Sequence, residues 1–115
     1  MGWVYYANYL YYFEVGRSDL IRSLWKSYRE MEADGIILPV VESHCRYVEG
    51  ARYEDELEIT SVLSAPGPAR IRFDYEIRRV DCENLLVEGY TIHCFVNKSG
   101  RPMRMPDDLV RALVI

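Results

Sequence analysis

The sequence predicts one α+β domain, in which a long central helix is wrapped by a curved antiparallel sheet. Three observations predict this class. Apolar residues recur at helical spacing through residues 8–33, the segments between residues 36 and 97 alternate with a period of two, and the connections between those segments are short. Helices that are segregated from strands along the chain are typical of α+β folds, and short connections favour antiparallel neighbours.

Residues 8–33 carry the pattern of one amphipathic helix, because their apolar positions fall three, four and seven residues apart. Asn8 is expected to cap the N-terminus, since its side-chain oxygen can accept a backbone N–H of the first turn. Gly35 is expected to end the helix in the left-handed conformation. About 26 residues at about 1.5 Å each give a rod of roughly 39 Å, which suits a helix lying along a sheet. The apolar positions are Leu10, Phe13, Leu20, Leu24, Tyr28 and Met31.

Four strands are expected after this helix, joined in succession as an antiparallel meander. The third strand alternates most cleanly, with apolar residues on one face and charged residues on the other. Proline and glycine at residues 65–68, and polar residues at 81–84, predict two of the turns. A short helix is expected from Pro106 to Leu113. The four expected strands are residues 36–48, 57–64, 71–78 and 85–97.

Length and composition place the chain among ordinary globular proteins. At 115 residues it fits a single domain, 1–115. A net charge of −4 argues against non-specific nucleic-acid binding, which needs a basic face. No apolar run approaches the roughly 20 residues of a membrane-spanning helix. Because neither a signal peptide nor paired cysteines are recognised, we expect a cytoplasmic protein with reduced thiols.

A segment near the N-terminus, residues 2–14, reads GWVYYANYLYYFE. It resembles the signature of the 4-hydroxybenzoyl-CoA thioesterase-like family, approximately D-x-x-G-h-V-h-[HY]-x-[NS]-Y-h-x-[YW]-[FM]-E, where h is apolar. Residues 14–17, EVGR, stand where the family often has E-x-[AG]-R. Residues 45–55, CRYVEGARYED, resemble the family's second-strand segment, Y-x-x-P-[AL]-x-[YF]-[DG]-D, with Gly50 where the family usually has proline. The resemblance follows the whole chain in order.

The resemblance implies a hotdog fold, in which the sheet wraps the long helix, and the function of an acyl-CoA thioesterase. It also implies homodimers or homotetramers with active sites at the dimer interface, and a reaction without metal or cofactor. The expected partners are therefore an acyl-CoA substrate and copies of this chain, with no nucleic acid and no membrane insertion. His44 and His93 are the only histidines and are not spaced as zinc ligands, so the residues themselves also predict no metal site.

The chemistry of thioester hydrolysis explains the form of the N-terminal motif. The thioester carbonyl must be polarised, and a backbone N–H at a helix N-terminus stabilises the oxyanion that develops there. The resemblance assigns this N–H to Tyr6, and it assigns to Gly2 a tight bend that lets the substrate approach the backbone. The family's carboxylate acts as general base or nucleophile. In this numbering it would fall two residues before Met1.

Three explanations of that position are open. The chain is a fragment of a longer protein, its start codon is assigned to an internal methionine, or it is a natural short form. We therefore expect residues 1–115 to form a hotdog domain that is incomplete at its N-terminus, without the family's first strand and carboxylate. Loss of a general base typically costs about 10²–10⁴-fold in rate, so a natural short form would hydrolyse thioesters slowly.

The candidates for substrate binding each have a structural alternative. Arg52 lies at a strand connection and Arg70 follows the turn at residues 65–68, so both can contact phosphates of CoA or remain solvated surface charges. Asn8 can orient substrate or water, or only cap the helix. Tyr53 can pack against the acyl group or pantetheine arm, or seal the core.

Tyrosine is abundant near the N-terminus, with five of the ten between Tyr5 and Tyr12. A tyrosine buries a large ring while its hydroxyl still needs a partner, which suits a half-open pocket as well as core and dimer packing. We count Tyr5 among the substrate-binding candidates. Glu14 is either a substitute carboxylate or, as its spacing favours, an ion-pair partner of Arg17.

Three functions are compatible with the sequence: an enzyme, a binding module and a structural domain that binds no ligand. The first is hydrolysis of acyl-CoA to free acid and CoA. The alternative is a catalytically weak hotdog module that binds acyl-CoA or an acyl carrier protein. A purely structural dimerisation domain is the third, and it would bind no CoA ester.

Overall fold

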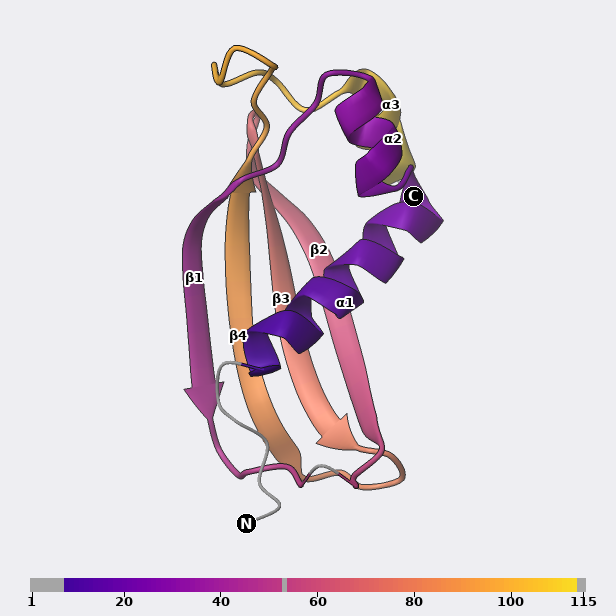
Figure 1. Ribbon diagram of the computed structural model, residues 1–115, viewed down its shortest axis with the longest axis vertical. Helices are drawn as coiled ribbons and strands as arrows, with labels where there is room; N and C mark the ends of the chain where they lie inside the picture. Colours follow the sequence, from indigo (N-terminus) through magenta and orange to yellow (C-terminus); the bar gives the residue numbers. More distant parts are fainter. Residues whose placement is uncertain (1–7, 53, 114–115) are drawn as a thin grey trace.

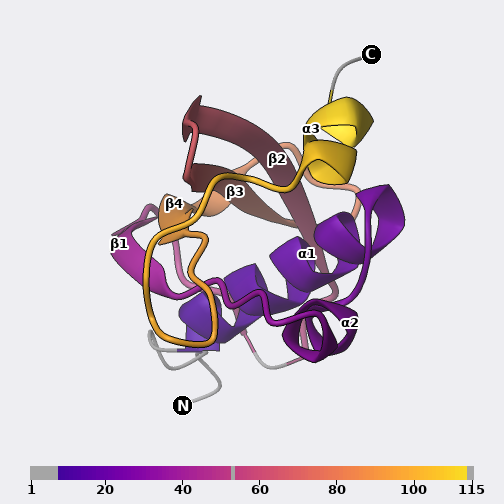
Figure 2. The same ribbon diagram turned by 90° about the horizontal axis from the view of Figure 1, so that it is seen from above.

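The computed structural model describes residues 8–52 and 54–113, which form two helices, four strands and a third helix in that order. Figure 1 shows the first helix lying diagonally across one face of the sheet, and Figure 2 shows the sheet curving around it. The expected α+β class, with a helix wrapped by an antiparallel sheet, is confirmed. The elements are α1 (Asn8–Leu24), α2 (Tyr28–Ala33), β1 (Val40–Tyr47), β2 (Leu57–Gly67), β3 (Arg70–Arg79), β4 (Leu85–Cys94) and α3 (Asp107–Leu113).

The four strands form one antiparallel sheet in the order β1-β4-β3-β2. β2, β3 and β4 are joined in succession as predicted, but β1 pairs with β4, from Val40 opposite His93 to Tyr47 opposite Val87. The predicted meander is therefore wrong for the first strand. The reason is the connection at residues 48–56, which exceeds the about two to five residues of a β-hairpin loop. It instead crosses the end of the sheet to reach β2 (Figure 1).

The inner face of the sheet, which packs against α1, carries the core. On β3 the predicted alternation is confirmed, because Ile71, Phe73, Tyr75 and Ile77 are all buried while the charged residues between them are not. Directly opposite residues of paired strands share a face. The partners of these four on β4 are His93, Thr91, Gly89 and Val87, so they also face α1.

α1 lies close to the sheet at two places. The ring of Phe13 stacks on that of Tyr75, with centroids 4.3 Å apart and planes 5° from parallel. One turn further, Gly16 lies against β2, where an added Cβ would be 2.6 Å from Ser61 Oγ and 2.9 Å from Ile59 Cγ2. The absence of a side chain at Gly16 therefore sets how closely the helix approaches the sheet.

The single helix predicted over residues 8–33 is in fact two helices, α1 and α2. Ser27 caps α2: its hydroxyl accepts the N–H of Glu30 at 3.2 Å, and the Glu30 carboxylate accepts the N–H of Ser27 at 3.2 Å. This reciprocal capping box starts a new helix and turns the chain, although the apolar periodicity continues to the buried Met31. Gly35 follows α2 with φ 81°, the predicted left-handed stop.

The predicted short C-terminal helix is confirmed as α3, and it packs near the end of α1. The indole Nε1 of Trp25 donates a hydrogen bond of 2.8 Å to Asp108 Oδ2. β2 continues through Gly67, with a register shift after Ser64, so the turn expected at residues 65–68 is shorter than predicted. None of the helices in the described parts of the chain is long and apolar enough to cross a membrane.

Candidate active site

The N-terminus of α1 lies over the inner face of the sheet, beside β4 and toward β1 (Figure 1). Its first described residue is Asn8, which is half-buried and already part of the helix. This end of a helix carries a partial positive charge that favours a negatively charged oxygen. Gly2, Tyr5, Tyr6 and Tyr53 lie outside the described residues, so their roles, and those of Asn8, stay predictions.

Tyrosines gather at this end of α1. The buried Tyr9 contacts Tyr12 with ring centroids 6.0 Å apart and Tyr47 of β1 with centroids 5.5 Å apart. Its hydroxyl accepts the backbone N–H of Ala51 at 2.8 Å. Because Ala51 is buried and belongs to the connection between β1 and β2, this bond fixes that connection to the first turn of the helix.

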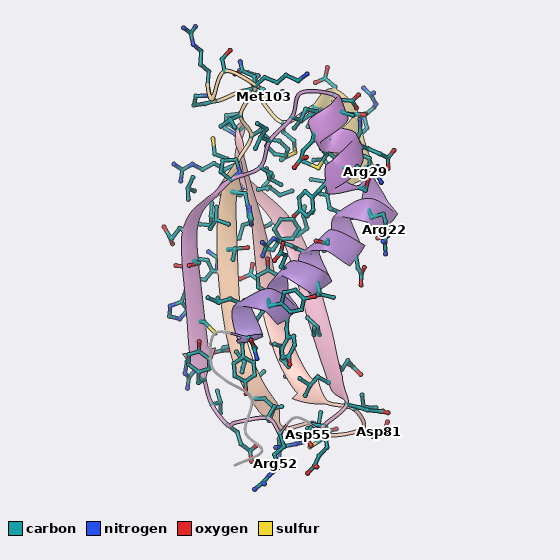
Figure 3. The ribbon with its side chains drawn as sticks, viewed as in Figure 1. Arg22, Arg29, Arg52, Asp55, Asp81 and Met103 are labelled. Carbon is teal, nitrogen blue, oxygen red and sulfur yellow. The ribbon has the colours of Figure 1, made fainter. Side chains whose placement is uncertain are left out.

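The same connection carries Arg52, the candidate ligand for a CoA phosphate. Asp55 holds its backbone, accepting the N–H of Arg52 at 2.8 Å and Arg79 Nε at 3.0 Å. The Arg52 N–H, together with the Arg79 guanidinium, lowers the pKa of Asp55. Figure 3 shows Arg52 and Asp55 together at the end of the sheet that lies away from Met103. A cationic side chain is thereby placed at the end of the sheet where Tyr9 anchors the connection.

Arg70, the other expected phosphate ligand, lies elsewhere. It begins β3 and pairs with Cys94, whereas Tyr47 beside Tyr9 pairs with Val87, seven residues back along β4. At about 3.3 Å per residue, Arg70 is therefore roughly 23 Å from Tyr47 along the sheet. Within one chain the structure brings Arg52, and not Arg70, toward the N-terminal half of α1.

Two adjoining cavities follow the side of α1 that faces β1. The first, of about 320 Å³, is lined by residues that include Leu10, Tyr11 and Thr91, and the second, of about 350 Å³, by residues that include Tyr28 and His93. We call the two together the α1–β1 trough. The residues that line both are Glu14, Arg17 and Val40. The trough therefore runs from the first turns of α1 to α2, and both apolar and polar groups line it.

A chain of hydrogen bonds lies along the inner side of the trough. His93 Nδ1 is 3.0 Å from the carbonyl oxygen of Leu38, and His93 Nε2 is 2.9 Å from Thr91 Oγ1, which is 2.6 Å from the Tyr75 hydroxyl. A carbonyl can only accept, so neutral His93 carries its proton on Nδ1 and Nε2 accepts from Thr91. Thr91 then accepts from Tyr75, so each of the three side chains has a hydrogen-bond partner.

The protonation of this chain is set by its burial. Burial lowers the pKa of His93 to about 4, the Leu38 carbonyl opposes that change, and the nearby positive charge of Arg17 adds to it. Burial raises the pKa of Tyr75, against the effects of Thr91 and Arg17. His93 is thus a neutral hydrogen-bonding group at neutral pH and holds no charge in the trough.

Arg17 lies differently from what the sequence suggested. Among the described residues it forms no ion pair with Glu14, and its Nε atom is buried without a hydrogen-bond partner. The Tyr28 hydroxyl is also buried without a partner. The position of Arg17 follows from helix geometry, because it lies four residues after the buried Phe13 and so on the side of α1 that packs on the sheet. Glu14 is one position off that side and is exposed.

Sequence reasoning did not single out this polar group as a candidate site, although a signal for it was available. Thr91 and His93 lie two residues apart on β4 and both face the core, where polar side chains are uncommon unless they have hydrogen-bond partners. The apolar periodicity predicts Tyr28 on the apolar face of one continuous helix and gives no position for its hydroxyl. In the described residues, no group of three or more histidine, cysteine, aspartate or glutamate side chains could hold a metal ion.

Comparison with known proteins agrees with this architecture. The model of the Thioesterase-like superfamily matches residues 1–113. The "Putative acyl-CoA thioesterase YneP" of Bacillus subtilis is 32% identical over 100 residues, which are 87% of this chain and 72% of that protein.

Solved structures resemble the chain over nearly its whole length. The hypothetical protein TT1821 from Thermus thermophilus is 32% identical with a TM-score of 0.89, covering 98% of this chain and 85% of that one. The DHNA-CoA thioesterase from Staphylococcus aureus is 29% identical with a TM-score of 0.88, covering 97% and 77%. The chain therefore belongs to the thioesterase-like superfamily and has the hotdog fold of its thioesterases.

Proposed function

We propose that the chain hydrolyses acyl-CoA thioesters to a free acid and CoA at the N-terminus of α1. The observation that carries this proposal is the superfamily match, which covers the motif at residues 2–14 and all of α1. The names of the Bacillus relative, "Putative acyl-CoA thioesterase YneP", and of the Staphylococcus relative, a DHNA-CoA thioesterase, support the same substrate class.

The proposed reaction uses the electrostatics of the helix N-terminus. The backbone N–H of Tyr6 donates to the thioester carbonyl oxygen, and Gly2 allows that carbonyl to come close to the main chain. Water adds to the carbonyl carbon, the oxyanion is stabilised by this N–H and the helix dipole, and the C–S bond then breaks. The thiolate of CoA takes up a proton and the acid leaves. The resemblance gives the general base a position before Met1, so no described residue is assigned that role.

The two ends of the substrate have candidate positions on either side of this point. Arg52 is fixed by Asp55 and by the bond from Ala51 to Tyr9, which suits it to contact a phosphate of CoA. Tyr5, Asn8 and Tyr53 remain candidates for contacts nearer the thioester. Arg70 is too distant to join Arg52 on one phosphate and would contact CoA only from another subunit. The α1–β1 trough is the proposed place for the acyl group.

We also propose that the active form is a homodimer joined along β1, or a homotetramer made of two such dimers. β1 is an edge strand of the described sheet, so it presents unpaired backbone groups. Its apolar side chains are also exposed, since Val40, Val41 and Tyr47 keep 46–48% of their surface. A second copy added at this edge would extend the sheet and cover the trough. Light scattering after size exclusion measures the assembly.

A thioesterase assay tests the function directly. Release of CoA is followed with a thiol reagent for short-chain, long-chain and aromatic acyl-CoA esters. Both this chain and a form that includes any residues encoded in frame before Met1 are measured. Hydrolysis by either form supports the enzyme. Saturable binding of an acyl-CoA without hydrolysis by either form would contradict it and favour the acyl-CoA or acyl carrier protein binding module.

A further inference from the structure

The strongest unused feature of the molecule is the pair of buried donors at the inner end of the trough. Arg17 Nε and the Tyr28 hydroxyl have no hydrogen-bond partner, although a donor left buried and unpaired costs about 1–3 kcal/mol. The neighbouring Tyr75, Thr91 and His93 are hydrogen-bonded to one another and to Leu38. Burial raises the pKa of the Tyr28 and Tyr75 hydroxyls, and the nearby Arg17 opposes that change at both. Arg17 Nε and the Tyr28 hydroxyl are therefore buried polar atoms to which a ligand oxygen can offer a hydrogen bond.

These donors lie at the far end of the trough from the proposed thioester position. Arg17 is nine residues after Asn8, which is roughly 13 Å along a helix axis, and its side chain leans back toward the N-terminus. Between the two ends the trough is lined by Leu10, Tyr11 and Val40. An acyl chain of medium length that starts at the helix N-terminus and follows this lining reaches the guanidinium.

The charges of the trough decide which kind of oxygen suits these donors. Arg17 and Tyr28 both offer a hydrogen to an acceptor, while His93 is neutral. Glu14 and Glu32 also line the trough, so a carboxylate at the distal end of an acyl group is repelled by these two side chains. A hydroxyl or ketone oxygen accepts from Arg17 and from Tyr28 without that repulsion.

We propose that Arg17 and Tyr28 are specificity-determining residues that select acyl groups carrying a neutral oxygen, a hydroxyl or ketone, at the end away from the thioester. This inference rests on the proposed thioesterase function, since it assigns the acyl group of that substrate to the trough. Arg17 then contacts the substrate directly. This contact explains why a charged side chain is kept at a half-buried position.

The experiment compares three acyl-CoA esters that differ only at the distal carbon: octanoyl-CoA, 8-hydroxyoctanoyl-CoA and octanedioyl-CoA. For the native assembly we expect kcat/KM to be about 10- to 100-fold higher for the hydroxylated ester than for octanoyl-CoA, as for a hydrogen bond to a charged donor. Octanedioyl-CoA is expected to be hydrolysed more slowly than 8-hydroxyoctanoyl-CoA.

Variants separate a contact with substrate from a structural effect. Arg17→Met is expected to reduce the ratio of kcat/KM for 8-hydroxyoctanoyl-CoA to kcat/KM for octanoyl-CoA to about one. The main change is slower hydrolysis of the hydroxylated ester, because its hydrogen bond to the charged guanidinium is lost. Tyr28→Phe is expected to lower the ratio in part. Arg22→Met removes the same charge from the same helix, but Arg22 points to solvent beside Asp19, so the ratio is expected to stay as in the native protein (Figure 3).

The outcomes distinguish the inference from the function on which it rests. If the native protein hydrolyses octanoyl-CoA and 8-hydroxyoctanoyl-CoA equally, or if Arg17→Met leaves their ratio unchanged, the thioesterase stands and the inference is overturned. If no ester is hydrolysed, the thioesterase proposal fails. Binding of free 8-hydroxyoctanoate and octanoate, followed by NMR titration of native protein and Tyr28→Phe, then decides the inference alone: equal affinities overturn it, and tighter binding of the hydroxy acid by the native protein supports it.

Discussion

The ring of Phe13 on α1 lies directly over Gly89 on β4, with Phe13 Cε2 only 2.9 Å from the position that a Cβ at residue 89 would take. On the other side, that Cβ would be 2.2 Å from the carbonyl oxygen of His44 on β1. Gly89 thus lets the helix and the edge strand approach one point of the sheet.

Gly89→Ala is therefore expected to destabilise the fold by about 1–3 kcal/mol, because β1 and Phe13 must move to admit one methyl group. Chemical denaturation followed by circular dichroism measures the change. Gly67→Ala is the matched control, since a Cβ there has no atom within 4 Å, and its effect should be small. Equal stabilities of the two variants would contradict the packing described.

The bond from Ala51 to Tyr9 predicts a local effect on the connection that carries Arg52. Tyr9→Phe removes the acceptor and leaves a buried N–H unpaired, which costs about 1–3 kcal/mol. Faster hydrogen exchange of the Ala51 amide and a higher KM for acyl-CoA are expected. Tyr11→Phe, at a residue that is 60% exposed, serves as control for the exchange of the Ala51 amide. Unchanged protection of Ala51 in Tyr9→Phe would show that the hydroxyl does not anchor this connection.

His93 predicts a dependence of stability on pH. Its pKa is lowered by burial from 6.5 to about 4, so between these values the unfolded chain binds a proton that the folded chain does not. The free energy of unfolding should therefore fall as pH decreases from about 6.5 to about 4, by about 3 kcal/mol from this residue, and be independent of it above that window. Denaturation at several pH values measures the slope. His93→Gln should remove this decrease in the free energy of unfolding between pH 6.5 and 4. His44→Gln, at an exposed residue, should leave it in place.

Tyr6 offers a test that separates its backbone from its side chain. Tyr6→Phe keeps the N–H and is expected to retain kcat, while Tyr6→Pro removes it. Loss of one oxyanion donor costs about 10²–10³-fold in kcat. Steady-state kinetics, with circular dichroism to confirm folding, measures both. A Tyr6→Pro enzyme as fast as Tyr6→Phe would exclude this N–H as the donor.

Most of the fold could be predicted because period and turn chemistry are local. The alternation from Ile71 to Ile77 identifies the buried face of one strand, and Gly35 marks the end of the helix that precedes it. The pairing of β1 with β4 could not be read in this way, because it depends on where a connection of intermediate length crosses the sheet. The start of α2 at Ser27 was predictable in principle, but the apolar period through Tyr28 and Met31 outweighed the capping box.

The site was less predictable, for a different physical reason. Its motif residues near Tyr6 were found through resemblance, whereas Arg17 was paired with Glu14 from helix spacing alone. Spacing of three residues permits that pair but does not orient it, and the packing of Phe13 turned Arg17 toward the sheet instead. Arg52 and Arg70 looked equivalent in sequence, and only the strand register separates them by most of the length of the sheet.

The position of a bound substrate carbonyl tests the central claim most directly. A crystal structure with a non-hydrolysable ketone analogue of acyl-CoA, in which a methylene group separates sulfur from the carbonyl, gives the distance from its oxygen to the Tyr6 nitrogen. We predict about 2.7–3.2 Å, with the acyl chain following α1 toward Arg17. A Tyr6 N–H that instead donates to a main-chain carbonyl, or an analogue bound away from the start of α1, would contradict the assignment.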